Sequence, residues 1–114
     1  MSESYSVIIT PEAQSDISKI IHYIAGELKA PQAAVNLNDL FLKSIKDLAV
    51  FPKRNMVIDE EPWGSEKIRK LIVKNYYVYY NVNDLTRTIS IIAVIYAGID
   101  QTKQIINAAK LNSR

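Results

Sequence analysis

The chain has 114 residues, of which 48% are hydrophobic and 23% charged, and it contains one histidine and no cysteine. This length accommodates one hydrophobic core, so we expect a single domain over residues 1–114. The lack of cysteine excludes disulfides, a thiolate nucleophile and a cysteine-ligated metal site, and one histidine is too few for a metal centre; neither metal nor cofactor is expected. No apolar run reaches the roughly 18–20 residues of a membrane span, and the start lacks signal-peptide features, so a cytoplasmic protein without membrane contact is predicted.

The formal net charge of +2 is unevenly distributed along the chain. Residues 1–66 contain ten acidic and six basic residues, a net charge of −4, whereas residues 67–114 contain two acidic and eight basic residues, a net charge of +6. The second half therefore favours a negatively charged partner. A charged surface that is merely solvated explains the same numbers equally well.

The first half of the chain predicts a strand followed by two helices. Ser4 to Thr10 is a short β-branched run, and Thr10 followed by Pro11 is a favourable helix start. Apolar residues then recur at spacings of three and four, which predicts one helix from Pro11 to about Leu28 and, after Ala30-Pro31, a second to about Val50. The short connection between them implies an antiparallel helical hairpin.

The second half predicts three strands joined by tight turns. After a loop over residues 51–66, strands are expected at about 67–73, 76–83 and 88–96. The last of these is apolar on both faces, so we expect it to be central in the sheet. Beyond Asp100, residues 105–110 suggest a short optional helix. The predicted fold class is α+β, with the order β-α-α-β-β-β and the helical hairpin packed on an antiparallel sheet.

Strand alternation divides the tyrosines of residues 76–83 between the two faces of the sheet. Tyr76 and Tyr80 share a face with two valines and are predicted to lie in the core. Tyr77 and Tyr79 point the other way, where they can stack on bases, line a groove for a partner, or simply pair with neighbouring rings across strands. The sheet also carries cations in or beside its strands, which suits a partner with negative charge: Lys67, Arg69, Lys70, Lys74 and Arg87.

Two blocks of the sequence resemble the RelE/ParE superfamily of toxins from bacterial type II toxin–antitoxin systems. Residues 8–52 are similar to the family's strand and helical hairpin through Tyr23-Ile24, Ala33-Ala34 and an exit at Phe51-Pro52. Residues 68–84 and 91–100 are similar to its Arg-x-Leu strand, its tyrosine-rich strand and its last strand ending in a bend and an aspartate. The resemblance covers most of the chain and implies a RelE/ParE-like fold.

The resemblance implies a growth-inhibiting toxin, of the kind associated with plasmid stabilisation, that is neutralised by a cognate antitoxin. RelE-like members cleave mRNA in the ribosome with basic residues and a tyrosine, whereas ParE-like members bind and poison DNA gyrase. The partners implied are therefore an acidic antitoxin, with gyrase or the ribosome and its mRNA as the target. A homodimer or a toxin–antitoxin hetero-oligomer is also expected. A catalytically silent binding module that retains only the antitoxin is the alternative.

Carried over to this sequence, the candidate catalytic residues are Lys70, Arg69 and Tyr77. The candidate target-binding residues are Lys67, Lys74, Tyr79, Arg54 and Tyr96.

Several nuclease positions of the family are substituted in this chain. Ile68 stands at a position where a lysine is usual, Tyr77 replaces an arginine, and Gly98-Ile99 replaces a basic pair. No tyrosine follows Asp100, so Tyr96 is the nearest substitute. Phosphoryl transfer depends on positioned cations, so these departures favour a ParE-like or weakened nuclease function.

For four residues, a structural role is weighed against a functional one. Arg69 can contact phosphate or can face the helices and pair with an acid such as Glu66 or Asp84. His22 suits a solvent-exposed helix position better than a general base. Trp63 is expected to be a local packing anchor, and Arg54 either extends the basic surface or ends a solvated loop.

Overall fold

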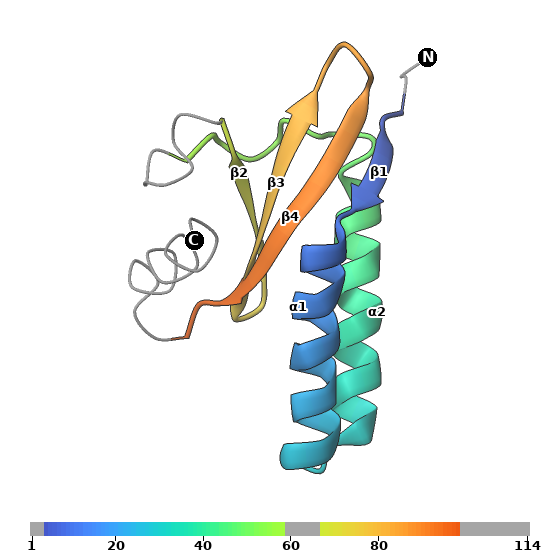
Figure 1. The fold of residues 1–114 in the computed structure, drawn as a ribbon, viewed down its shortest axis with the longest axis vertical. Helices are drawn as coiled ribbons and strands as arrows, with labels where there is room; N and C mark the ends of the chain where they lie inside the picture. The colour runs from blue at the N-terminus through green and yellow to red at the C-terminus, as the bar shows by residue number, and fades with distance from the viewer. Residues whose placement is uncertain (1–3, 59–66, 99–114) are drawn as a thin grey trace.

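The computed structural model of this chain describes residues 4–58 and 67–98. Two helices pack on one face of a four-stranded sheet (Figure 1), which confirms the predicted α+β fold. The optional helix at residues 105–110 and Trp63 fall outside the described residues. The elements, in chain order, are β1 (Ser6–Ile9), α1 (Pro11–His22), a π-helical turn η1 (Tyr23–Glu27), α2 (Pro31–Asp47), β2 (Arg69–Val73), β3 (Tyr76–Asn83) and β4 (Thr88–Tyr96).

The start of α1 is fixed by the local chemistry that the sequence predicts. The Thr10 hydroxyl accepts a hydrogen bond from the Ala13 N–H at 3.2 Å and donates one to the Ile91 carbonyl at 2.8 Å. Pro11 occupies the first helical position, where its missing N–H is not needed. The cap therefore starts the helix and also ties it to β4.

The end of the first helix differs from the prediction. The helix is α-helical only to His22 and then continues as a π-helical turn over Tyr23–Glu27, in which the Leu28 N–H reaches the Tyr23 carbonyl at 3.1 Å. Lys29 then adopts a left-handed conformation, with φ of 52°, which stops the helix. The hairpin turn is consequently complete before Pro31 begins α2.

The sheet is mixed, whereas a wholly antiparallel sheet was predicted. The strand order is β1-β4-β3-β2, and β1 runs parallel to β4 while the other pairs are antiparallel. The chain between β1 and β4 contains the helical hairpin, β2 and β3, and is long enough to allow a parallel pairing. The prediction that the last strand is central is confirmed, because β4 lies between β1 and β3.

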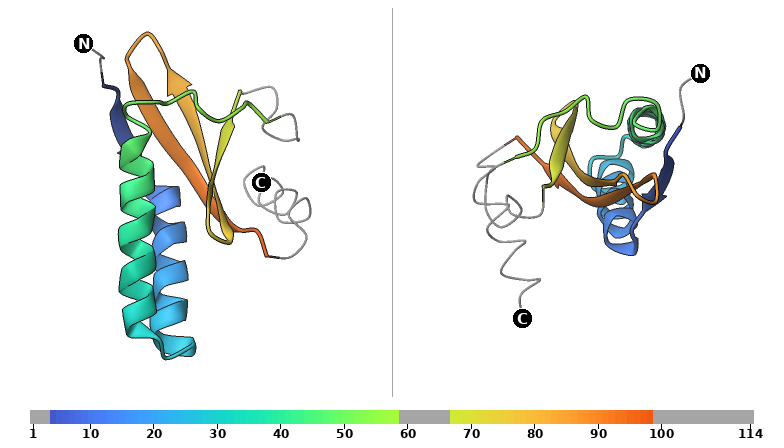
Figure 2. Two further views of the ribbon diagram at one scale, coloured as in Figure 1. Left: turned by 180° about the vertical axis from the view of Figure 1, so that it is seen from behind. Right: turned by 90° about the horizontal axis from the view of Figure 1, so that it is seen from above.

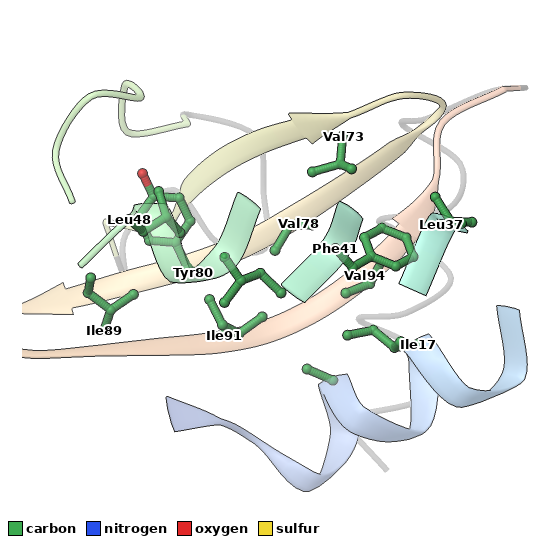
Figure 3. Close-up of a cluster of buried hydrophobic side chains, with 12 residues drawn as sticks. Ile17, Leu37, Phe41, Leu48, Val73, Val78, Tyr80, Ile89, Ile91 and Val94 are labelled. Atoms are coloured by element: carbon green, nitrogen blue, oxygen red, sulfur yellow. The ribbon is translucent and has the colours of Figure 1, made fainter. Parts of the chain in front are cut away.

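The main core lies between the sheet and the two helices. Figure 3 shows its side chains converging from α1, α2 and three of the strands. Phe41 of α2 is fully buried at its centre, with its ring 5.4 Å from that of Tyr76. Both helices lie on the same face of the sheet (Figure 2), which we call the proximal face; the opposite one is the distal face.

Among the described residues, none of the helices is long and apolar enough to span a membrane.

Candidate functional site

Strand pairing between β2 and β3 assigns each candidate residue to a face of the sheet. Residues directly opposite each other in an antiparallel pair project to the same side. Lys70 pairs with Tyr79 and Ile72 pairs with Tyr77, and these four residues belong to the distal face. Arg69 pairs with Tyr80, which lies in the main core, so Arg69 belongs to the proximal face.

Lys70 and Tyr77 are the two candidate catalytic residues that the structure brings together. The Lys70 ammonium lies 4.4 Å from the centroid of the Tyr77 ring, in a cation–π contact between diagonal neighbours on β2 and β3. Such a contact contributes about 0.5–1 kcal/mol at a partly exposed site. The ammonium is held in place on the distal face, where it can bind a phosphate or a carboxylate.

Tyr79, in contrast, is fully buried on the distal face. It forms a second apolar cluster with Ile58 and Ile68, both of which are also buried. The expectation that Tyr79 offers an exposed ring for stacking is therefore wrong. Ile68 lies inside this cluster, where a charged side chain would be costly to desolvate.

Arg69 faces away from Lys70 and holds the loop that follows α2. Its Nη1 donates a hydrogen bond to the Asn55 carbonyl at 2.6 Å. The predicted alternative of a helix-facing Arg69 is confirmed, although the partner seen is a backbone carbonyl and not the expected carboxylate. Arg69 therefore cannot act beside Lys70 in this structure.

Tyr80 anchors the same loop from the proximal face. Its hydroxyl donates to the Pro52 carbonyl at 2.8 Å and accepts from the Asn55 side-chain amide at 3.1 Å. Burial raises the pKa of the Tyr80 hydroxyl, with Asn55, Arg69 and Arg54 acting in the opposite direction. The predicted core position of Tyr80 is confirmed, and its buried oxygen is satisfied by the loop.

Arg54 has a structural role at the end of α2. Its Nη2 donates to the Asp47 carbonyl at 2.8 Å, and its Nε donates to the Phe51 carbonyl at 3.1 Å. The Asp47 carbonyl, at the end of the helix, also accepts from the Val50 N–H at 3.3 Å. The positive charge of Arg54 complements the helix dipole there. Arg54 is exposed, so its charge still contributes to the surface.

A β-bulge in β4 moves Tyr96 to the proximal face. Tyr79 pairs with Ala93 but Tyr80 pairs with Ile91, so Ile92 is an extra residue that reverses the alternation beyond it. Tyr96 consequently lies opposite Tyr76, with their ring centroids 5.5 Å apart. Strict alternation would place Tyr96 on the distal face with Lys70, whereas the structure places it on the proximal face.

Gly98, one of the family departures, makes room for Tyr96. A Cβ atom on Gly98 would overlap the phenol of Tyr96, so any other residue requires the ring to move.

The bulge is supported by an aspartate that the sequence gave no reason to select. The Asp16 carboxylate of α1 accepts a hydrogen bond from the Val94 N–H of β4 at 3.0 Å. Burial raises the pKa of Asp16, while this hydrogen bond and Lys19 act to lower it. Asp16 therefore accepts a hydrogen bond from a backbone N–H of β4 that lies beyond the end of the short strand β1. Its carboxylate is partly removed from water as a result.

Lys67 and Lys74 lie at opposite ends of β2. Both are exposed and both have a left-handed backbone, with φ of 56° and 53°. The seven residue steps between them correspond to about 20 Å in an extended chain. They can extend a positively charged surface, but they cannot act on the same phosphate.

Two further features were not selected from the sequence. One is a polar network in which Asp84 accepts hydrogen bonds from Lys53 at 2.7 Å and from Tyr5 at 2.8 Å. The Lys53 bond is the main reason for the lowered pKa of Asp84.

The other feature is a groove of about 450 Å³ between α1 and α2, with an apolar floor that includes Ile17 and Leu42. His22 lines this groove and is exposed, as predicted.

Across residues 4–58 and 67–98, no three histidine, aspartate or glutamate side chains gather in a way that could hold a metal ion. In this part of the chain, the distal face presents the Lys70 ammonium, the Tyr77 ring beneath it and the apolar surface around them.

A family profile and several solved structures match this chain. The profile of a family described as the ParE toxin of the type II toxin–antitoxin system parDE matches residues 7–100. The fold is similar to that of a chromosomal ParDE system from P. aeruginosa, with a TM-score of 0.64 and 20% identity over 82% of this chain and 96% of that one. No match is found among curated proteins.

Two other solved structures share the fold. The RelBE2 toxin–antitoxin complex from Mycobacterium tuberculosis gives a TM-score of 0.57 at 20% identity, over 82% of this chain and 92% of that one. A mutant of the E. coli toxin RelE in the free state gives a TM-score of 0.54 at 14% identity, over 93% and 97% of the two chains. At these identities the structural similarity concerns the fold alone.

Proposed function

Because the chain belongs to the ParE toxin family of type II toxin–antitoxin systems, we propose that it inhibits growth by binding DNA gyrase and not by cutting mRNA. The observation that carries this proposal is the separation of the candidate nuclease residues. Arg69 and Tyr96 project to the proximal face, Tyr79 is buried, and Lys70 is left with Tyr77 on the distal face.

This separation matters because phosphoryl transfer accumulates negative charge in the transition state. Enzymes stabilise that charge with several positioned donors around one phosphate. Here the distal face offers Lys70 amid apolar side chains such as Ile95, while Lys67 and Lys74 stand about 20 Å apart along β2. Such a surface lacks the several donors around one phosphate that cleavage of RNA requires.

We further propose that a cognate antitoxin neutralises the toxin in the cytoplasm. The ParDE and RelBE2 relatives are described as toxin–antitoxin systems, and the groove between α1 and α2 has the apolar floor that an amphipathic helix requires. A hetero-oligomer of toxin and antitoxin follows from this proposal. An acidic antitoxin gene beside the toxin gene is the expected genomic arrangement.

One observation favours a second candidate function, ribosome-dependent mRNA cleavage. Lys70 is held above Tyr77 on the face where RelE-like toxins carry their catalytic cations, and Lys74 at the end of β2 can add a phosphate contact. If this function holds, a Lys70→Ala, Lys74→Ala double variant that still folds should lose toxicity.

Induction of the toxin in a susceptible host separates the possibilities. We expect double-strand DNA breaks and an SOS response, without new mRNA ends at the ribosomal A site. Mapped A-site cleavage without DNA damage would establish the RelE-like function instead. Neither effect, with antitoxin binding intact, would identify a silent binding module.

A further inference from the structure

The sheet has β1 at one edge and β2 at the other (Figure 1), and the two edges differ in how their outer sides are occupied. At β1, the Tyr5 N–H donates to the Ala49 carbonyl at 2.9 Å, and the Gln14 side-chain amide donates to the Ile9 carbonyl at 3.1 Å. The outer side of this four-residue strand is therefore occupied near both of its ends. An uncovered sheet edge is a template for strand addition, and β1 offers little room for it.

At β2, the segment that follows α2 pairs with the start of the outer edge only. The Ile58 N–H donates to the Ile68 carbonyl at 2.8 Å, and Val57 forms an isolated antiparallel bridge with Arg69. In the described part of the chain, no strand pairs with the outer side of β2 beyond this bridge. The rest of this edge is consequently available to another strand.

The backbone groups that point outward from β2 follow from its alternation. Successive residues of an antiparallel strand direct their N–H and C=O groups to opposite sides, and the Ile68 carbonyl points outward, to Ile58. The backbone groups of Lys70 and Ile72 therefore point outward as well, whereas those of Leu71 point to β3. Ile72 is 64% exposed, which leaves this part of the edge accessible.

The side chains along β2 determine what an added strand would meet. Lys70 and Ile72 project to the distal face, and Lys74 follows in the exposed turn after the strand. Within residues 4–58 and 67–98, neither lysine forms an ion pair with a carboxylate. Side chains directly opposite each other on adjacent strands interact, so a carboxylate opposite Lys70 and an apolar side chain opposite Ile72 are favoured.

These features favour an acidic, extended segment over other occupants of the edge. A second copy of this chain would bring its own β2 lysines beside these, and like charges on adjacent strands are destabilising. A nucleic acid has no peptide groups with which to continue the sheet. A folded protein surface seldom carries an unpaired strand, because native proteins protect such edges. A segment that becomes ordered only on binding has free peptide groups to offer.

We propose that the outer edge of β2 binds an acidic segment of a partner protein by strand addition. The backbone of that segment, which is unfolded until it binds, pairs with Ile72, and one of its carboxylates lies beside Lys70. The site is separate from the groove between α1 and α2, since none of the described residues that line the groove belongs to β2. It does not depend on whether the target of the toxin is gyrase or the ribosome.

The first test is an NMR titration of isotope-labelled toxin with a blocked peptide in which glutamate and valine alternate. The peptide should bind, and at saturation the hydrogen exchange of the Ile72 amide should slow at least about tenfold, because this N–H becomes hydrogen-bonded. A peptide with lysine in place of glutamate should bind at least about tenfold more weakly. Added salt should reduce the difference between the two peptides.

Ile72→Pro tests the backbone contact. Proline removes the outward N–H and leaves the hydrogen bonds between β2 and β3 in place, as prolines on edge strands do. The variant should bind the glutamate peptide about tenfold more weakly. Ile72→Val keeps the N–H and most of the side chain, so this matched control should bind within about threefold of the wild type. A thermal melt verifies that both variants fold.

Lys70→Glu tests the charge contact and keeps the proposal testable if the proline variant does not fold. It should reverse the preference, so that the lysine peptide binds more tightly than the glutamate peptide. Lys43→Glu, at an exposed position on α2, is the matched control and should leave the preference of the wild type unchanged.

The outcomes that would overturn the proposal are distinct. Absence of binding, an Ile72 amide that exchanges as fast in the bound toxin as in the free one, or full binding by a folded Ile72→Pro variant would exclude strand addition at β2. Equal affinity for the two peptides, or a preference that Lys70→Glu leaves unchanged, would exclude the acidic partner. A toxin that is dimeric without peptide, and that Ile72→Pro makes monomeric, would assign the edge to a second copy of the chain instead.

Discussion

The two faces of the sheet carry similar aromatic residues but use them differently. On the proximal face, Tyr76 and Tyr80 are covered by the helices and by the loop that follows α2. On the distal face, Tyr79 is buried in a small separate cluster while its neighbour Tyr77 supports Lys70. Residue type therefore does not decide which tyrosine can meet a partner. Local burial decides it.

The largest expected effect concerns the centre of the proximal core. Phe41→Ala removes a fully buried ring that contacts Tyr76 and should lower the free energy of unfolding by about 3–5 kcal/mol. Denaturant titration followed by circular dichroism measures it. A loss below about 1 kcal/mol would mean that the helices are not packed on the sheet as described.

The next prediction compares the two distal tyrosines directly. Tyr79→Ala should cost about 3 kcal/mol because the ring is fully buried, whereas Tyr77→Ala should cost about 1 kcal/mol because the ring is only partly buried. The same denaturant titration gives both values. Equal costs would contradict the division of the distal face into a buried cluster and an accessible pair.

Removing a single hydroxyl tests the link between the proximal face and the loop. Tyr80→Phe leaves the Pro52 carbonyl and the Asn55 amide without their partner and should cost about 1–2 kcal/mol. Tyr76→Phe is the matched control, and we expect a smaller loss. If the two variants are equally stable, the Tyr80 hydroxyl does not hold the loop.

The smallest effect depends on pH and concerns Asp16. Burial raises the pKa of this carboxyl above its unfolded value of 3.8, so its ionisation opposes folding. The stability that Asp16 contributes is therefore present below pH 3.8 and is lost as the pH rises through the folded-state pKa. Asp16→Asn keeps an oxygen that can accept from the Val94 N–H and removes the charge. It should raise stability at pH 7 by less than about 1 kcal/mol, because the group is half exposed.

Unfolding measured at pH 7 and at pH 3 checks this prediction, since the gain should disappear at pH 3. A variant that is clearly less stable than the wild type at pH 7 would show that the Asp16 charge is favourable where it lies. Asp84 has the opposite sign, because its lowered pKa means that its contribution is lost as the pH falls.

Much of the fold could be predicted from periodicity and local signals. Thr10-Pro11 and Pro31 marked the helix starts, and β2, β3 and β4 lie within two residues of the predicted strands. The parallel pairing of β1 could not be predicted, because it depends on the path of the whole chain between β1 and β4. The bulge at Ile92 was also missed, since the surrounding run is apolar on both sides and gives no signal of a change in alternation.

The candidate site was less predictable than the fold, because the burial and the hydrogen bonds of its residues depend on segments distant in the sequence. Alternation correctly grouped Tyr77 and Tyr79 on one face, and the strand register shows that Lys70 lies on that face as well. The burial of Tyr79 depends on Ile58, which lies 21 positions earlier in a segment without clear periodicity. The partner of Arg69 is a backbone carbonyl, which no residue type can reveal.

The most direct test of the proposed function is a titration of purified gyrase with the wild-type toxin and with the Lys70→Ala, Lys74→Ala double variant. If the toxin acts by docking on gyrase, the wild type inhibits supercoiling, and the double variant does so within about threefold of it, because this function needs no cations positioned around a phosphate. Intact gyrase activity at saturating wild-type toxin, accompanied by ribosome-dependent mRNA cleavage that the double variant loses, would contradict the proposal.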